Sequence, residues 1–199
     1  MNKTKIIALL IAILGTVLFL NSYLKETEGW ESLNQKGVTA FKESRYAEAE
    51  KYFVQAVDLA EKFSEKDLRI NFSLNQLAEI YRIQSKYNKA EQVLRKLLDV
   101  YKKQLGTEHV NVALTLNNLA VNFRMQKKYE EAETALKEAI QILGKSLGPD
   151  HSLVEGLLQH YAFLLNIMGH AEDLKKINKR IDEIHSKSVA EKNSSNRPK

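Results

Sequence analysis

The fold of this chain is decided by two near copies of one stretch: KYNKAEQVLRKLLDVYKKQLGTEHVNV at residues 86–112 and KYEEAETALKEAIQILGKSLGPDHSLV at residues 128–154. They begin 42 residues apart and agree at Lys-Tyr, Ala-Glu, Leu-Gly, a histidine and a valine. Self-similarity at a fixed period of about 20–50 residues is typical of repeat proteins.

The period extends through most of the chain at spacings of 41 or 42 residues. Four series carry it: small residues at Gly37, Ala78, Ala120 and Ala162; leucines at Leu33, Leu74, Leu116 and Leu158; a second-helix series at Ala49, Ala90, Ala132 and Leu174; and tyrosines at Tyr46, Tyr87 and Tyr129. The sequence therefore predicts four repeating units, at about 29–69, 70–111, 112–153 and 154–184.

Each unit is predicted to contain two helices. Leu116, Leu119, Ala120 and Phe123 follow the i, i+3, i+4, i+7 spacing of one helical face, and a second apolar stripe follows Tyr129. Short side chains allow two antiparallel helices to approach closely, so we expect Ala120 and Ala132 to face each other. The connections LGTEH and LGPDH place a glycine where positive φ is favoured after a helix end.

These residues resemble the tetratricopeptide repeat. The small residue, the tyrosine before the second helix and the two alanines within it are similar to that family's pattern. The 42-residue spacing and the sequence pattern LGxxHxxVA…LNNLA resemble the long-helix variant of this repeat in kinesin light chain. The resemblance covers residues 29–184 and implies an all-α, right-handed α-solenoid of about four helical hairpins. One hydrophobic N-terminal helix is expected before them, from the apolar run described below.

Two departures from the pattern stand out. The first connection, SEKDLRI, lacks the Leu-Gly signal, so its geometry is not predicted by the resemblance. The fourth unit has Leu174 where alanine is expected and a polar Asn178 on the same helix, which predicts a modified capping helix.

The N-terminus predicts a membrane segment. Residues 1–5 carry Lys3 and Lys5, and residues 6–24 are uncharged and mostly apolar. As a helix they reach about 28 Å, close to the hydrocarbon thickness of a bilayer. We interpret them as an uncleaved anchor, followed by a linker at 25–28, with the N-terminus cytoplasmic and the body exoplasmic or periplasmic. A cleaved signal peptide, giving a secreted or periplasmic protein, is the alternative.

Charge argues against nucleic-acid binding. The net charge is +5, of which Lys3 and Lys5 contribute two and residues 185–199 contribute three, so residues 6–184 sum to zero. A neutral body lacks the basic face that phosphate neutralisation needs. Residues 185–199 are polar, basic and without apolar periodicity, which predicts a disordered tail.

Nothing in the sequence indicates catalysis or a cofactor. It contains no G-x-S-x-G, no phosphate-cradling glycine loop and no cysteine for a thiolate metal site. His109 and His151 occupy equivalent connections, and His160, His170 and His185 share no metal-ligand spacing. We therefore expect no catalytic, cofactor-binding or metal residues, and structural roles for the histidines at connections and helix ends.

One polar series suggests a binding surface. Amides follow the aligned leucines at Asn34, Asn75, Asn117 and Gln159, and arginines follow seven residues later at Arg82 and Arg124. The resemblance implies that first helices line a concave groove, where amides could hold an extended peptide's backbone and arginines its carboxylates. Alternatively, the amides bond to neighbouring helices and the arginines are solvated. The family's carboxylate clamp, which pairs a lysine with an asparagine, is not matched.

Two functional hypotheses remain open. The first is a non-catalytic, membrane-anchored scaffold that binds a protein or extended peptide in its groove. The second is a permanent accessory or assembly subunit of a larger membrane complex.

Overall fold

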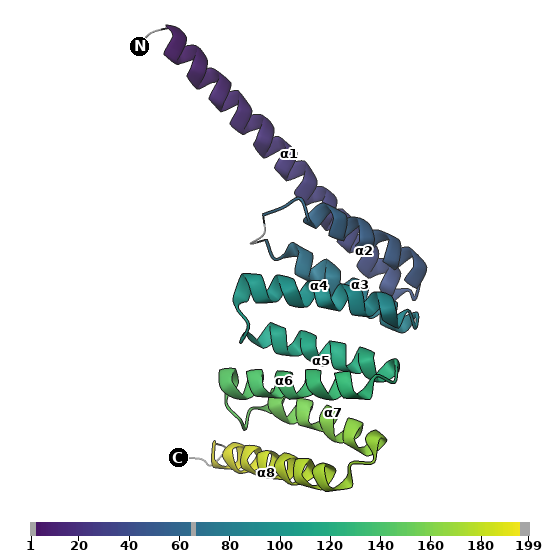
Figure 1. Cartoon of the computed structure of the whole chain (residues 1–199). Helices are drawn as coiled ribbons and strands as arrows, with labels where there is room; N and C mark the ends of the chain where they lie inside the picture. The colour runs from purple at the N-terminus through teal and green to yellow at the C-terminus, as the bar shows by residue number, and fades with distance from the viewer. Residues whose placement is uncertain (1–2, 65–66, 196–199) are drawn as a thin grey trace. The chain divides into compact units, whose positions relative to one another are not determined.

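The computed structural model describes residues 3–64 and 67–195, which contain eight α-helices and no strand (Figure 1). The helices are α1 (Lys3–Lys42), α2 (Tyr46–Ala60), α3 (Arg69–Ile83), α4 (Tyr87–Leu105), α5 (Val110–Met125), α6 (Tyr129–Leu147), α7 (Ser152–Met168) and α8 (Ala171–Ser195). The all-α repeat fold that the 42-residue period predicts is confirmed.

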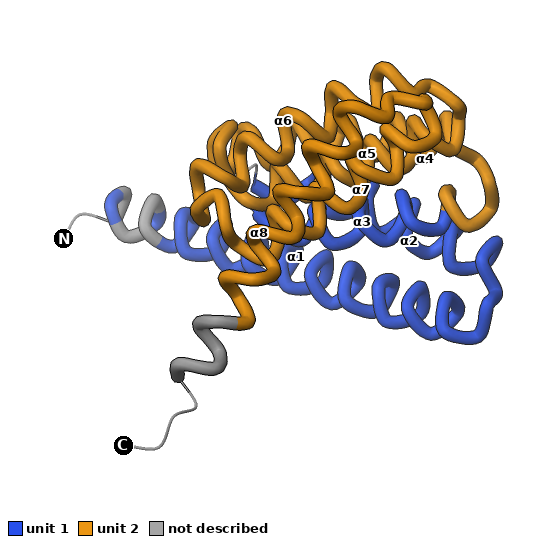
Figure 2. Tube along the Cα trace, turned by 90° about the horizontal axis from the view of Figure 1, so that it is seen from below, with its two compact units in different colours: residues 1–80 blue, residues 81–199 orange. Residues whose placement is uncertain are grey.

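The chain divides into two compact units, residues 1–80 and residues 81–199 (Figure 2). The first unit contains α1, α2 and most of α3. The second contains the end of α3 and α4 to α8.

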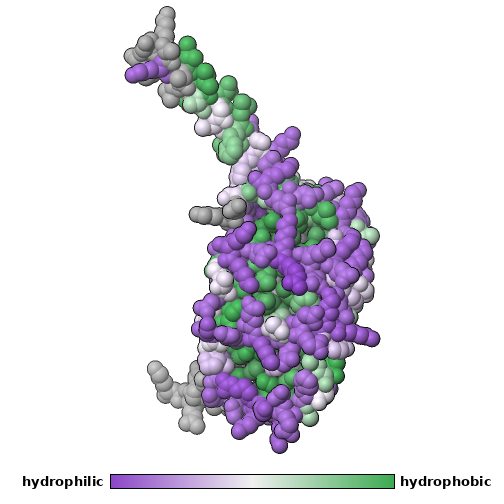
Figure 3. Space-filling model, viewed as in Figure 1, coloured by the Kyte–Doolittle hydropathy of each residue, from purple (hydrophilic) through white to green (hydrophobic). Residues whose placement is uncertain are grey.

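In the first unit, α1 is one unbroken helix with two different halves. Its C-terminal half pairs with α2, whereas its N-terminal half extends beyond α2 and carries exposed apolar side chains (Figures 1 and 3). Residues 25–28, which we expected to link an anchor to the repeats, lie inside this helix. They contain no glycine or proline, so nothing in their sequence interrupts the backbone hydrogen bonding.

The close approach of α1 and α2 depends on a glycine. A Cβ placed on Gly37 would lie 2.8 Å from Cζ of Phe53, whose side chain is fully buried. The equivalent small residues, Ala78, Ala120 and Ala162, are also buried. The small-residue series therefore occupies the interior, as expected.

In the second unit, each helix from α4 to α7 packs against the helix that follows it along the chain. The interior between them is almost entirely aliphatic; its most buried large side chains include Leu97, Val112, Leu143, Leu164 and Leu165. Ala90 and Ala132 are fully buried at the start of α4 and α6.

Each hairpin turns on one residue in the left-handed region. Ser44, Ser85, Lys127 and Gly169 have φ of 59°, 57°, 61° and 76°, at the same 41- and 42-residue spacing as the repeats. In each turn the next residue's N–H donates to a carbonyl five residues earlier, as Lys128 does to Phe123 at 2.9 Å. This is the bonding of a Schellman motif, which three of the hairpins form without glycine.

Two of the connections between hairpins follow the predicted chemistry. Gly106 and Gly148 have φ of +90° and +97°, as their place after a helix end suggested. His109 and His151 cap the next helices: each Nδ1 accepts a hydrogen bond from the backbone N–H two residues later, at 3.1 Å. The structural role expected for these two histidines is confirmed.

The last helix is longer than the sequence analysis predicted. We expected a disordered tail from residue 185, whereas α8 continues to Ser195, and residues 196–199 lie outside the described chain. Alanine, glutamate and lysine in this segment favour helix. The start of this segment is also held to the rest of the unit. Ile184, the residue just before it, is buried, and Lys187 pairs with Asp150 at 2.7 Å.

A glutamate near the start of α4 and another near the start of α6 bond to the hairpin that follows. Glu91 of α4 accepts hydrogen bonds from Gln126 (3.0 Å) and Lys128 (3.1 Å) at the end of α5 and the turn after it. Its equivalent, Glu133 of α6, accepts a hydrogen bond from the Tyr161 hydroxyl of α7 at 2.8 Å. Within the second unit these carboxylates join successive hairpins.

This bonding makes a pH-dependent contribution to stability. Burial raises the pKa of Glu91, but hydrogen bonds from Gln126, Lys128 and Arg95 outweigh burial, so the pKa is lowered overall. A carboxylate whose folded pKa lies below its unfolded value stabilises the fold above the unfolded pKa. That stabilisation is lost as pH falls through the folded pKa.

We therefore expect Glu91→Gln to lower the free energy of unfolding at pH 7 by about 1–2 kcal/mol. The difference from the natural protein should shrink as pH falls below about 4.5, near the unfolded pKa of glutamate. Urea denaturation followed by circular dichroism at several pH values measures it. The control is Glu138→Gln, whose exposed ion pair with Lys102 at 3.7 Å should contribute little. A difference independent of pH would contradict the assignment.

Candidate interaction surface

The predicted amide series is divided between the two units, and its first member is a core residue. Asn34 is 5% exposed; its Nδ2 donates to the Trp30 carbonyl at 2.8 Å and its Oδ1 accepts from Ser73 Oγ at 3.1 Å. Trp30 Nε1 in turn donates to Ser73 Oγ at 3.1 Å. The expectation that Asn34 faces a ligand is not met, because this buried network uses both polar ends of the amide.

Asn75 is also in the first unit. It is half-buried on α3, and its Nδ2 donates to the carbonyl of Asn71, one turn earlier, at 3.0 Å. This bond lies within one helix, so it is neither a contact with a neighbouring helix nor a contact with a ligand.

In the second unit, the next two amides lie on α5 and α7. Asn117 is half-buried, and its Oδ1 lies 2.7 Å from Nδ1 of His160, so that nitrogen carries the proton in this arrangement. Gln159 is exposed, with its Nε2 3.4 Å from Glu155 Oε1. The Asn117–His160 contact shows that α5 and α7 lie side by side there.

The predicted arginines have different surroundings. Arg124 of α5 is half-buried, and its guanidinium lies 4.9 Å from the ring centroid of Phe163 on α7. This cation–π contact leaves the edge of the guanidinium able to meet a carboxylate. Arg82 is half-buried near the end of α3.

Exposed apolar side chains complete the surface. Phe163 is 54% exposed and Ile167 is 40% exposed, although both are large hydrophobic residues. With His160 they occupy positions i, i+3 and i+7 of α7. We call this surface the α5–α7 face and define it by Asn117, Arg124, Gln159, His160, Phe163 and Ile167.

His160 and Phe163 are not among the residues predicted for a binding surface. The histidine was expected to have a structural role, and the predicted series contains only positions in register with the leucines. A signal was present, because the spacing of residues 160, 163 and 167 defines a helical stripe beside the buried Leu158, Tyr161 and Leu165.

A separate surface, which is concave, lies between α4, α5 and α6. It has a volume of about 450 Å³ and a floor that includes Leu98, Leu116 and Phe123. Cations of α4 and carboxylates of α6 stand around it, and Lys102 pairs with Glu138 across the two helices at 3.7 Å. These charges partly compensate one another. The cleft therefore attracts a charged group on a partner less strongly than the α5–α7 face does.

Metal chemistry is not apparent at either place. Among the residues that the structure describes, no three histidine, aspartate or glutamate side chains gather where they could hold an ion.

The fold and its surfaces define the class of protein: an all-α repeat protein built from helical hairpins. Residues 31–63 and residues 69–145 each match a family model described as tetratricopeptide repeat. The chain therefore contains tetratricopeptide repeats. No curated protein sequence matches it.

Several solved structures have a similar fold. A putative kinesin light chain of Podosopora anserina, with nearly identical TPR-like repeats, is 18% identical over 81% of this chain and 76% of its own, with a TM-score of 0.71. BtubC (BKLC) from P. vanneervenii is 20% identical over 86% of this chain and 68% of its own, with a TM-score of 0.72. The apo form of RapI is 17% identical over 81% and 44%, with a TM-score of 0.72. At these identities the likeness shows the fold alone.

Proposed function

We propose that this protein is a non-catalytic scaffold: a repeat domain anchored in a membrane that binds a protein or an extended peptide. The proposal rests on the exposed apolar side chains in the N-terminal half of α1. Its N-terminal half exposes Ile11, Leu14, Leu18 and Phe19 at 60% or more, yet the same helix continues into the first hairpin. It is long and apolar enough to cross a membrane, a property that signal sequences share.

Apolar surface on this scale favours lipid over water, at about 25 cal/mol per Å² transferred. The 19 uncharged residues 6–24 reach about 28 Å as a helix, enough for the hydrocarbon layer. Two lysines, Lys3 and Lys5, precede them, whereas one lysine, Lys25, follows directly, together with Glu26, Glu28 and Glu31. The proposed topology accordingly has a cytoplasmic N-terminus and the repeats on the exoplasmic or periplasmic side.

We expect the full-length protein to stay in the membrane fraction after alkaline carbonate extraction, with its N-terminal residues intact by sequencing. Leu14→Arg together with Leu18→Arg should release it, because each charge at the centre of a span costs about 2.5–3.5 kcal/mol. Lys36→Ala, an exposed change in the hairpin half of α1, is the control. A mature N-terminus near Tyr23 would show a cleaved signal and refute the anchor.

The binding part of the proposal is supported by the composition of the α5–α7 face. It combines an exposed aromatic ring, an aliphatic side chain, two amides and a cation, which together suit a segment with apolar and acidic side chains. The tetratricopeptide repeats in the comparison add weight, since proteins of this fold commonly act as scaffolds for other proteins.

We expect Arg124→Ala to weaken partner binding about 10- to 100-fold, which corresponds to about 1.4–2.8 kcal/mol, and to leave stability nearly unchanged. Partners would be captured on the full-length protein, identified by mass spectrometry and then titrated as purified proteins. The loss should be greater at low salt, because part of it is electrostatic.

Arg82→Ala tests the other predicted arginine. Lys102→Ala at the α4–α6 cleft is the matched control. If Lys102→Ala is the damaging change, the binding surface is the cleft.

A permanent subunit of a membrane complex is the second candidate, and the exposed Phe163 and Ile167 favour it. A stable interface would cover these side chains continuously. Exchange of labelled for unlabelled partner distinguishes the two: exchange within minutes fits a scaffold, and none over hours fits a permanent subunit.

A further inference from the structure

The connection between α2 and α3 differs from the two later connections in both sequence and contacts. Residues 61–68 read EKFSEKDL and contain neither the Leu-Gly pair nor the capping histidine. Asp67 takes the capping role instead, since its Oδ1 accepts a hydrogen bond from the backbone N–H of Arg69 at 2.9 Å. The connection that lacks the Leu-Gly pair and the histidine is therefore capped by a different residue, Asp67.

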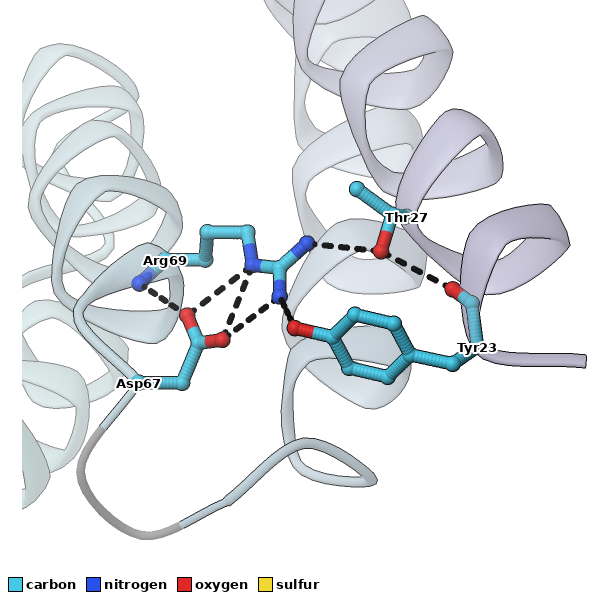
Figure 4. Close-up of polar contacts among 4 residues, drawn as sticks. All are labelled: Tyr23, Thr27, Asp67 and Arg69. Atoms are coloured by element: carbon cyan, nitrogen blue, oxygen red, sulfur yellow. Dashed lines mark hydrogen bonds and ion pairs between the residues drawn. The ribbon is translucent and has the colours of Figure 1, made fainter. Parts of the chain in front are cut away.

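Arg69 joins this connection to α1. Its Nη2 donates to the Tyr23 hydroxyl at 2.6 Å and its Nη1 to Thr27 Oγ1 at 2.9 Å (Figure 4). Its Nε and Nη2 also bond to the Asp67 carboxylate, at 2.9 and 2.6 Å. We call these four residues the Arg69 cluster: Tyr23, Thr27, Asp67 and Arg69. Four of the five guanidinium N–H groups are thus engaged.

The cluster is suited to surroundings of low polarity. The arginine and aspartate side chains are only 18% and 17% exposed. The guanidinium lies 3.9 Å from the ring centroid of Phe63, 5.5 Å from that of Tyr23 and 5.9 Å from that of Trp30. The Arg69 side-chain hydrogen bond lowers the pKa of Asp67, so the pair remains ionised and neutral overall. A paired, hydrogen-bonded and ring-covered charge avoids most of the cost of leaving water.

The cluster also lies at a defined depth along α1. Tyr23 is the last residue but one of the uncharged run, where the helix would leave the hydrocarbon, and tyrosine favours that boundary. The Arg69 guanidinium bonds to the Tyr23 hydroxyl at 2.6 Å and therefore lies near that level. Leu68 directly precedes Arg69 and is 57% exposed, and Leu24 beside Tyr23 is 48% exposed. An exposed leucine thus directly precedes the residue that is bonded to α1 where the helix would leave the hydrocarbon.

From this arrangement we infer that Leu68 makes a second membrane contact: its side chain enters the lipid at the headgroup boundary, and the Arg69 cluster fixes it there against α1. The inference rests on the proposed anchor and specifies how the first unit meets the membrane. Two contacts, the N-terminal half of α1 and Leu68, then hold the first hairpin at the membrane surface. Residues 25–28 form no flexible joint between them, because they lie inside α1.

The natural chain has no cysteine, so single cysteines can carry an environment-sensitive fluorophore in the full-length protein. Three positions are labelled: Leu68→Cys, Leu14→Cys in the anchor, and Ala47→Cys, which is exposed at the other end of the same hairpin. Ala47 follows the turn after Lys42, and the 18-residue rise from Leu24 to Lys42 is about 27 Å. The proteins are reconstituted in phosphatidylcholine–phosphatidylglycerol vesicles with lipids spin-labelled near the headgroup or deep in the chain.

We expect the label at position 68 to be blue-shifted and quenched by the shallow spin label several-fold more than the label at 47. The label at 14 should be quenched best by the deep spin label. Quenching at 14 with none at 68 would overturn the inference and leave the anchor intact. No quenching at 14 would overturn the anchor and, with it, the inference.

A second variant tests the cluster. Arg69→Ala, combined with Leu68→Cys, should reduce quenching at position 68 towards the value at 47. Trp30, the only tryptophan, reports whether the first unit remains folded. If its emission shifts to that of an unfolded chain, Tyr23→Phe replaces Arg69→Ala, because it removes one hydrogen bond and keeps the ring. Unchanged quenching at 68 in a folded variant would show that the cluster does not hold the contact.

Discussion

Replacing Phe53 by alanine is expected to lower the free energy of unfolding of the first unit by about 3–5 kcal/mol. The ring is fully buried, lies against Gly37 and meets Phe72 edge to face at 6.4 Å. Truncation removes this apolar area and leaves a cavity. Denaturation of the full-length protein in detergent, followed by Trp30 fluorescence, measures the change. Tyr52→Ala, at a half-buried neighbouring position, should have a smaller effect.

The contact with Gly37 can be isolated by a double-mutant cycle. Gly37→Ala places a Cβ about 2.8 Å from the ring, which should cost more than the roughly 1 kcal/mol that alanine gains in helix propensity. In a Phe53→Leu background the shorter side chain relieves the clash, and Gly37→Ala should become neutral or stabilising. Equal costs in both backgrounds would show that Phe53 is not the obstacle.

Replacing Ala132 by leucine is expected to destabilise the second unit by about 1–3 kcal/mol. Ala132 is fully buried at the start of α6, as are the equivalent Ala49 and Ala90. Three added carbons would force apart helices that pack on both sides. The natural chain has leucine at this position only in α8, where Leu174 is half-buried and no further described helix packs beyond it.

Circular dichroism during urea denaturation measures this effect, and Ala120→Leu on the facing helix should give a similar loss. Gln141→Leu is the matched control, because residue 141 is exposed on the same helix and glutamine and leucine have similar helix propensities. An unchanged midpoint for Ala132→Leu would mean that this position does not face a neighbouring helix.

Much of the fold could be predicted because its signals are local and repeated. The small-residue series, the glycines after α4 and α6 and the capping histidines all act within a few residues of their own position. The turn residues were less predictable: Ser44, Ser85 and Lys127 adopt a left-handed conformation that their residue types do not favour. The hydrogen bonds that follow them hold that conformation in place.

Periodicity and composition predict the number of hairpins, their helical faces and the apolar N-terminal segment, because these patterns do not depend on which helices become neighbours. The surroundings of the polar residues, in contrast, depend on how the helices pack. Asn34 is buried because Trp30 and Ser73, which is 39 residues away, satisfy its amide. Arg69 binds Tyr23 across 46 residues, and Phe163 meets Arg124 across 39. A polar side chain is stable in either water or the interior, depending on its partners, and those partners come from distant helices.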